Sequence, residues 1–311
     1  MKRSKPALAP VAVFAYRRAD HLARMLDSLR ACRGFADTHV TIFVDGPKGA
    51  SDVTAVNEVR ALVTSLKLPN IEARFRQENV GLKNAIYSGV SELCQRFGRT
   101  IVLEDDLVLS PATLEYFNRG LDTYASDERV WGLGAYLYDT PSLRGRQAAF
   151  ALPFAHPWGW ATWSRAWDHF DPNEEVAPAI LSSRSFRMFF NAAGVRRFSD
   201  ILELSTEGRV NSWFIRWYYT VFMHGGLYIY PPRTLVNNIG VSGEGGTHGS
   251  RLNPYYLLTR PSKMSDYEVT FPTEIRVDYP ALDKVAASWE ARVQDGIALA
   301  GKLKRRLSRK T

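Results

Sequence analysis

Short apolar runs alternate with longer amphipathic stretches through the first third of the chain. The apolar runs have the length and composition of strands and lie at 11–15, 40–44, 71–75 and 100–104. Between them, apolar residues recur at helical spacing over 20–32, 52–66 and 81–97, with Asp20 placed to cap the first helix. Strands separated by helices of this length are typical of a mostly parallel sheet covered on both faces. The pattern predicts an α/β fold that binds its ligand at the carboxyl ends of the strands.

Three carboxylates, Glu104, Asp105 and Asp106, come directly at the end of the fourth predicted strand. Burying an unpaired carboxylate costs much free energy, so consecutive acids at a strand end are expected to face a cation. Hard oxygen ligands suit Mg²⁺ or Mn²⁺, and such ions usually share their site with phosphates. This indicates a metal-bound nucleoside diphosphate. The alternative that stays open is an acidic turn between two strands.

Polar residues follow two other predicted strands in the same way. Arg17 and Arg18 come after the first strand, and Asp45 comes after the second. Because the carboxyl ends of parallel strands meet at one edge of the sheet, we expect these residues and the acids to form a single site.

The second half of the chain is rich in aromatic residues and glycine. Three tryptophans, Trp158, Trp160 and Trp163, stand within seven residues, and a second aromatic cluster covers 213–219. The tryptophans fit either a hydrophobic core or an acceptor cleft in which one or two of them face a sugar ring. A glycine-rich segment at 240–249 contains His248 and has the composition of a mobile lid, with a plain surface turn as the alternative. Without repeats or a low-complexity linker, one continuous domain fits better than two.

Composition narrows the class of protein. The chain has 311 residues, 45% of them hydrophobic and 23% charged, which is ordinary for a globular protein with a large core. Two cysteines exclude a disulfide framework and a thiolate metal site, and they fit a reducing compartment. No apolar run reaches the roughly 18 residues that a membrane span needs. Residues 1–8 are expected to be a disordered lead-in and not a signal peptide.

The net charge of +8 is concentrated at the C-terminal end. Residues 282–303 have helical spacing, and residues 302–311 hold six basic side chains and no acid. This tail over 281–311 fits either an anionic membrane surface or a solvated terminus. Nucleic acid is not an expected partner, because no aromatic residues are interleaved with the basic ones.

The motifs in this order resemble those of glycosyltransferases with the GT-A fold, a Rossmann-like sheet flanked by helices. The similarity is greatest to the group related to N-acetylglucosaminyltransferase I and its bacterial relatives in surface-polysaccharide synthesis. It covers residues 9–260 and is carried by five segments: Tyr16–Arg18, Val44–Gly46, Asn79–Leu82, Leu103–Leu107 and Pro157–Trp163, followed by the glycine-rich segment. The resemblance implies one domain over 9–280, with a donor half at 9–140 and an aromatic-rich acceptor half at 141–280.

The resemblance also implies roles for single residues. Asp106 would ligate Mn²⁺ or Mg²⁺ on the donor diphosphate, while Glu104 and Asp105 would hold ribose or sugar hydroxyls. Arg18 would lie near the nucleotide phosphates and Asp45 would accept from a uracil base. His248 would lie on a segment that closes over the nucleotide.

The catalytic base does not follow the family pattern. An inverting transferase needs a carboxylate to deprotonate the acceptor hydroxyl, and the family places an aspartate where this chain has Asn211. An amide cannot accept that proton. Glu207 or Glu244 could serve instead, residue 211 could have been substituted, or the enzyme could retain anomeric configuration.

The sequence thus predicts a metal-dependent hexosyl- or N-acetylhexosaminyltransferase. It would move a sugar from a UDP-linked donor to a glycan or lipid-linked glycan, with inversion, in the cytoplasm or at the inner face of the membrane. The alternatives are a sugar nucleotidyltransferase and a non-catalytic carbohydrate-binding protein. The absence of glycine from Ala15–Ala19 disfavours the nucleotidyltransferase, whereas the missing base favours the binding protein.

Overall fold

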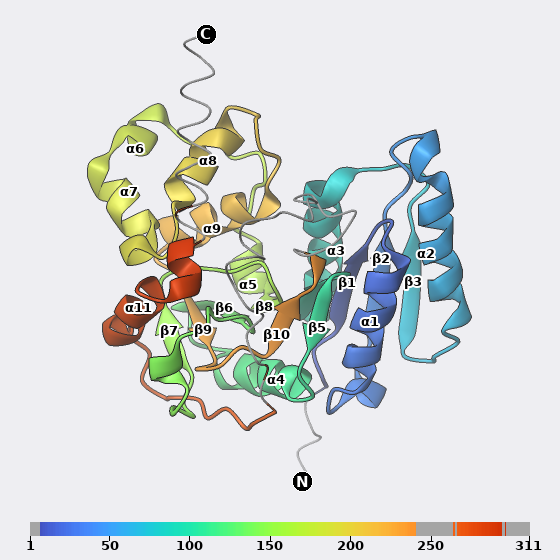
Figure 1. Ribbon diagram of the computed structural model, residues 1–311, viewed down its shortest axis with the longest axis horizontal. Helices are drawn as coiled ribbons and strands as arrows, with labels where there is room; N and C mark the ends of the chain where they lie inside the picture. The colour runs from blue at the N-terminus through green and yellow to red at the C-terminus, as the bar shows by residue number, and fades with distance from the viewer. Residues whose placement is uncertain (1–6, 241–263, 265, 294–295, 297–311) are drawn as a thin grey trace.

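A computed structural model describes residues 7–240, 264, 266–293 and 296 (Figure 1). Its main sheet has eight strands in the order β3-β2-β1-β4-β8-β6-β9-β7. The first four are parallel: β1 (Val11–Ala15), β2 (Val40–Val44), β3 (Ile71–Phe75) and β4 (Arg99–Glu104). They alternate with α1 (Ala19–Arg30), α2 (Val53–Ser65) and α3 (Gly81–Phe97). This confirms the predicted α/β fold, a largely parallel sheet flanked by helices.

The second half extends the same sheet with strands that run in both directions. It contributes β6 (Val130–Gly134), β7 (Phe150–Leu152), β8 (Trp160–Trp163) and β9 (Leu227–Tyr230). Strand β8 runs antiparallel to both β4 and β6, and β9 is parallel to β6. Strands β6 and β9 therefore point the same way as β1 and β4, so their carboxyl ends share one sheet edge.

A small second sheet lies next to this edge. It pairs β5 (Leu107–Leu109), directly after the acidic residues, with β10 (Val236–Asn238) in antiparallel fashion. The pairing brings a segment from late in the chain onto the acidic residues, and the sequence pattern did not predict it.

The remaining helices surround the second half of the sheet. The α-helices are α4 (Thr113–Thr123), α5 (Ser164–Trp167), α6 (Pro178–Ser182), α7 (Arg184–Phe190), α8 (Phe198–Thr206), α9 (Trp213–Met223) and α11 (Tyr279–Ala286). Short 3₁₀ helices are η1 (Phe35–Asp37), η2 (Ala50–Asp52), η3 (Pro141–Leu143) and η4 (Ala192–Gly194). Within the described residues, no helix is both long and apolar enough to cross a bilayer.

Two predicted helix boundaries need correction. Helix α1 has Arg18 at its N-cap, and Asp20 lies inside the first turn, where a carboxylate favours the positive end of the helix. The helix predicted from Leu282 begins earlier, at Tyr279, because Asp278 caps it by accepting from the Ala281 N–H. It ends at Ala286, and Ser288 then accepts from the Ala291 N–H at 3.3 Å, which starts a separate helical stretch.

An aromatic core fills the space between β8 and α9. Trp160 is 1% exposed, and its ring centroid lies 5.5 Å from that of Trp213 and 6.1 Å from that of Trp217. Trp163 is also buried, and its indole N–H donates to the Leu121 carbonyl. Neither ring has surface left to face a sugar, so we place both in the core. The acceptor role stays a prediction only for Trp158, which is half-buried.

Candidate functional site

The acidic residues form a tight turn between β4 and β5. The Asp105 N–H donates to the Phe14 carbonyl of the neighbouring β1 at 3.0 Å, which fixes the start of this turn against the sheet. Both turn residues are buried, with Asp105 3% and Asp106 8% exposed. The acidic stretch is therefore a turn between two strands, as one interpretation held, and it lies at the sheet edge where the sequence predicts a ligand.

Arg18 bridges the two aspartates from the end of β1. Its Nη2 donates to Asp105 Oδ1 and, at 3.0 Å, to Asp106 Oδ2. Because Arg18 is the N-cap residue of α1, the helix start holds its backbone at the same edge as the turn. The structure thus brings together the basic and acidic residues that the sequence placed after two different strands.

The chain after β10 covers this cluster. Asn238 donates from Nδ2 to Asp106 Oδ1 at 3.2 Å, and the Ile239 N–H donates to the Asp106 carbonyl at 2.8 Å. A Cβ at Gly240 would meet Asp106 Oδ2 at 2.2 Å and Arg18 Nη1 at 2.7 Å. Only glycine therefore lets the backbone come this close to the ion pair.

Sequence reasoning missed Asn238 and also His21. His21 lies in the first turn of α1, close enough to Arg18 and Asp106 for both to influence its charge, and it hydrogen-bonds the Ile239 backbone. Burial lowers the pKa of His21, and Arg18 lowers it further, whereas Asp106 raises it. The only sequence signal was the helical spacing of three residues from Arg18 to His21.

The acids outnumber their cation. Burial raises the pKa of the half-buried Glu104, and Asp106 and Asp105 raise it further. Burial likewise raises the pKa of Asp105, although Arg18 opposes this shift. Arg18 contacts Asp105 and Asp106, and Glu104 adds a third carboxylate within reach of their charges, which leaves an excess of negative charge. A divalent cation at this turn would therefore stabilise the ionised forms.

The donor chemistry fits such a cation. In the described part of the chain, no three acidic, histidine or cysteine side chains converge into a ready-made metal cage. Mg²⁺ and similar ions commonly take one or two carboxylates and complete their shell with water and phosphate oxygens. Asp106, the more exposed of the two turn residues, suits that arrangement.

Asp45 follows β2 at the same edge and serves the backbone. Its Oδ1 accepts from the N–H groups of Gly46 and Val80 at 3.0 and 3.1 Å, and its Oδ2 accepts from the Gly81 N–H at 3.0 Å. The bonds from Val80 and Gly81 satisfy free N–H groups at the start of α3. Contact with a nucleobase stays a prediction, for which Oδ2 keeps acceptor capacity.

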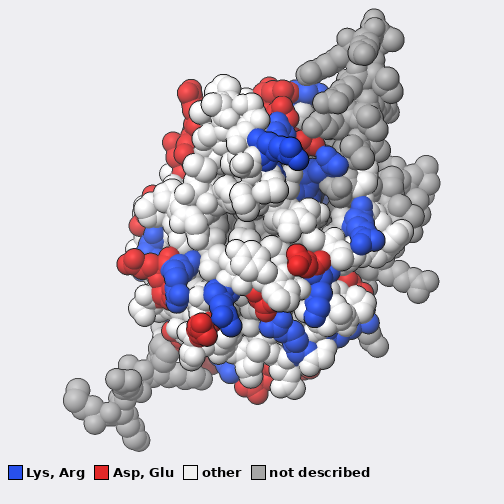
Figure 2. All heavy atoms as spheres, turned by 90° about the vertical axis from the view of Figure 1, so that its left-hand side faces the viewer, with Lys and Arg blue, Asp and Glu red and all other residues white. Residues whose placement is uncertain are grey.

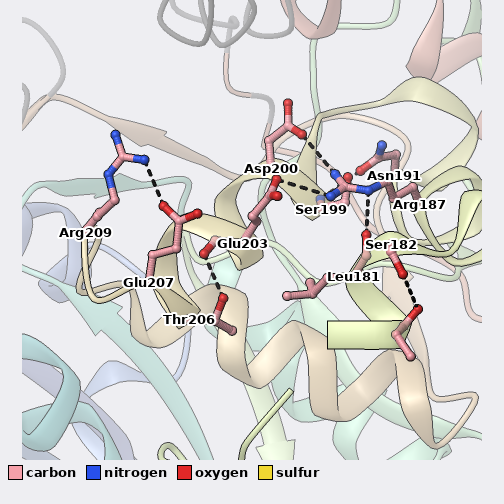
Figure 3. A network of polar contacts seen from close by, with 11 residues as sticks. Leu181, Ser182, Arg187, Asn191, Ser199, Asp200, Glu203, Thr206, Glu207 and Arg209 are labelled. Atoms are coloured by element: carbon pink, nitrogen blue, oxygen red, sulfur yellow. Dashed lines mark hydrogen bonds and ion pairs between the residues drawn. The ribbon is translucent and has the colours of Figure 1, made fainter. Parts of the chain in front are cut away.

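The two base candidates lie at helix ends in the second half. Glu207 ends α8 and pairs with Arg209 at 2.8 Å (Figure 3). It stands apart in that view from the ion pairs that Arg187 makes with Asp200 and Glu203. Asn211 is exposed and precedes Ser212, the N-cap of α9. Glu244 and His248 lie outside the described residues.

Comparison with known proteins finds similarity among solved structures. No protein-family model and no curated protein matches the chain. Among solved structures, it is similar to the mannosyltransferase PcManGT from Pyrobaculum calidifontis in complex with GDP-Man and Mn²⁺. The match has 12% sequence identity and a TM-score of 0.39, and it covers 70% of this chain and 78% of the other. Because both values are low, we base the function on the residues of the site, and the relationship to N-acetylglucosaminyltransferase I stays a prediction.

Proposed function

We propose that this protein is a divalent-metal-dependent glycosyltransferase that moves a sugar from a nucleotide sugar to a glycan acceptor. The observation that carries the proposal is the buried Asp105–Asp106 turn, which faces Arg18 at the carboxyl ends of β4 and β1. An acid-rich turn with one guanidinium is suited to a cation and to the phosphates bound to it.

Asp106 would hold Mn²⁺ or Mg²⁺, with Asp105 beside it. When bound, the metal ion would act as a Lewis acid for the negative charge that develops on the leaving nucleoside diphosphate. Arg18 orients the carboxylates of Asp105 and Asp106, and it would present its positive charge to the phosphates of the nucleoside diphosphate. Glu104 and Asp105 would accept hydrogen bonds from ribose or sugar hydroxyls.

The donor end of the site lies along β1 and β2. Asp45 Oδ2 is the acceptor that we assign to the base N–H of a uracil nucleotide, hence the preference for UDP. The segment at 240–249, with His248, would cover the nucleotide and exclude water.

The acceptor end needs a base if the reaction inverts the anomeric carbon. Glu207 is the described carboxylate that we assign to this step, and Asn211 marks the position where the resembled family carries an aspartate. The base would take the proton of the acceptor hydroxyl while that oxygen attacks the sugar.

The setting that we propose is the synthesis of a surface polysaccharide or glycolipid by a hexosyl- or N-acetylhexosaminyltransferase. The enzyme would work in the cytoplasm, with its basic tail on an anionic membrane. The face that carries α6, α7 and α11 shows charges of both signs around an uncharged centre (Figure 2). We assign membrane contact to the tail because residues 302–311 hold six basic side chains and no acid.

A thermal-shift screen of nucleotide sugars with Mn²⁺ tests the proposal. The true donor should raise the melting temperature in proportion to the logarithm of its concentration over Kd, and chelation of the metal should abolish the rise. Mn²⁺-dependent hydrolysis of the selected donor would exclude a non-catalytic binding protein. A chain that binds no nucleotide in calorimetry, with or without Mn²⁺, would disprove the proposal.

A further inference from the structure

A buried histidine outside the acidic site has an unused hydrogen-bond donor. His156 is 3% exposed, and its Nδ1 accepts from the Trp158 N–H at 3.4 Å. The ring proton therefore belongs on Nε2, and this nitrogen has no hydrogen-bond partner among the described residues. Burying such a donor unpaired costs free energy, which folded proteins normally avoid unless a ligand or water completes the bond.

A second unused donor belongs to the same cluster. Tyr138 connects the two, because its ring lies 5.6 Å from that of His156 and its hydroxyl hydrogen-bonds Arg196. The Arg196 Nε is buried without a partner, and within the described ranges no carboxylate forms an ion pair with Arg196. Glu290, an acid that contacts this cluster, accepts from the Tyr136 hydroxyl and, at 2.8 Å, from the Asp139 N–H.

Aromatic rings surround His156, and the cluster is linked to the acidic site through β10. The His156 ring centroid is 4.4 Å from that of Tyr136 and 5.0 Å from that of Trp158. The residue after Trp158, Gly159, accepts from the Ala135 N–H, and a Cβ on it would lie 3.2 Å from the β10 residue Val236. Strand β10 ends at Asn238, which donates to Asp106. The cluster is thus connected to the acid turn through Gly159 and β10.

We propose that His156 Nε2 and Arg196 form a subsite for an anionic oxygen group, a carboxylate or a phosphate, on the acceptor. Both free groups are donors and one is a cation, so the complementary group accepts only and carries negative charge. Trp158, which is half-buried, would pack against the sugar that bears this group. The identification of the ligand as the acceptor rests on the proposed function, whereas the binding of an anion does not.

Calorimetry on the full chain with glucose 1-phosphate, glucuronate and glucose tests the subsite. We expect at least one anionic sugar to bind and glucose not to bind. The Arg196→Gln variant should weaken binding about tenfold or more, since it removes a charged hydrogen-bond donor. His156→Asn should do the same, whereas His156→Gln, whose amide N–H lies near the Nε2 position, should retain most of the affinity.

Matched controls lie far from the cluster. His39→Gln, at the amino end of β2, and Arg74→Gln, on the edge strand β3, should leave the affinity unchanged. In the unchanged protein labelled with ¹⁵N-histidine, the His156 Nε2 resonance should move during the same titration. In that measurement a variant serves only to assign the His156 resonance, and the binding itself is followed in the unchanged protein.

Each outcome has a definite meaning. Tighter binding of the phosphate indicates a phosphate-bearing acceptor, and tighter binding of glucuronate indicates an acidic sugar. Equal binding of glucose, equal affinity in Arg196→Gln, or an unmoved His156 resonance would overturn the proposal. The affinity of UDP with Mn²⁺, measured separately, should not change in Arg196→Gln. If UDP fails to bind while the anion still moves His156, the glycosyltransferase function falls and the anion site stands.

Discussion

Arg18 Nη2 lies 3.0 Å from Asp106 Oδ2, although 88 residues separate the two in the chain. The same nitrogen also donates to Asp105, so one guanidinium holds both turn carboxylates. The order of β1 beside β4 in the sheet creates this contact. Since the arginine alone does not balance the acids, the pair is suited to a further cation.

The first prediction concerns the metal ligand. Asp106→Asn removes the negative charge that would hold the cation and should reduce sugar transfer by about 100-fold or more, as expected for loss of a group that supports transition-state charge. Glu104→Gln and Asp105→Asn should cost less. Calorimetry of UDP with and without Mn²⁺ should show that Asp106→Asn loses the metal-dependent part of the affinity. The surface variant Asp122→Asn is the control, and an Mn²⁺ response equal to that of the unchanged protein would contradict the assignment.

The second prediction concerns the backbone that covers the ion pair. Gly240→Ala places a methyl group where Asp106 Oδ2 and Arg18 Nη1 now lie, so the pair must separate. We expect a loss of stability of about 1–3 kcal/mol, as in overpacked sites, together with weaker binding of UDP and Mn²⁺. Urea unfolding and calorimetry measure the two effects. Gly49→Ala, where a Cβ would meet nothing within 4 Å, should change neither.

The third prediction concerns the base. Glu207→Gln should lower kcat by about 10²–10⁴-fold while donor affinity stays the same, because a general base acts on the chemical step. Glu203→Gln, on the same helix and also paired with an arginine, is the matched control. Should Glu207→Gln keep full turnover and Asn211→Asp raise it strongly, the base position would instead be residue 211.

The fourth prediction separates core from acceptor-side tryptophans. Trp160→Ala empties a buried site against Trp213 and Trp217 and should reduce the free energy of unfolding by about 3–5 kcal/mol. Trp158→Ala, at a half-buried position, should cost clearly less stability but raise the KM for the acceptor. Urea unfolding and steady-state kinetics distinguish these patterns, and equal losses of stability would place Trp158 in the core as well.

The fifth prediction concerns acid sensitivity. Burial, and next the charge of Arg196, hold the pKa of His156 well below its usual value of 6.5. The unfolded chain therefore takes up a proton below that pH that the folded chain does not. Above pH 6.5 the neutral His156 does not lower the free energy of unfolding. As the pH falls from there toward the pKa of the folded state, protonation of the unfolded chain lowers the free energy of unfolding by at most about 1.4 kcal/mol per pH unit.

His156→Gln removes this contribution. Urea unfolding at about pH 7.5 and pH 5 should show a smaller difference in the variant than in the unchanged protein, because glutamine does not titrate there. Burial raises the pKa of Tyr138, whose ring also lies against His156, to about 12, so this tyrosine does not titrate between these two pH values. An identical pH dependence in both proteins would show that His156 is not held neutral.

Local pattern was enough to predict the first half of the fold. The observed bounds of β1, β2, β3 and α3 coincide with the predicted ranges, because alternation of apolar strands and amphipathic helices is encoded over short windows. The prediction of one continuous C-terminal helix was wrong for a local reason. Ser288 starts a new helical stretch inside an apolar repeat, and the repeat alone does not show this break.

The strand order of the second half of the chain could not be predicted in the same way. Short strands such as β5, β7 and β10 carry few residues, and their partners lie far along the chain. The Trp158–Trp163 segment shows the consequence: its aromatic composition fits both core and cleft, and only the position of β8 between β4 and β6 buries Trp160 and Trp163.

The sequence by itself determined the α/β class and placed Arg18, Asp45 and the acidic turn at strand ends, because those features depend on residues that are neighbours in the chain. Tertiary structure alone decided that Asn238 and Gly240 cover Asp106, and that His156 and Arg196 meet around Tyr138. Such contacts join segments separated by many residues, and packing of the whole sheet selects them. The local sequence pattern of one segment does not indicate which distant segment it will contact.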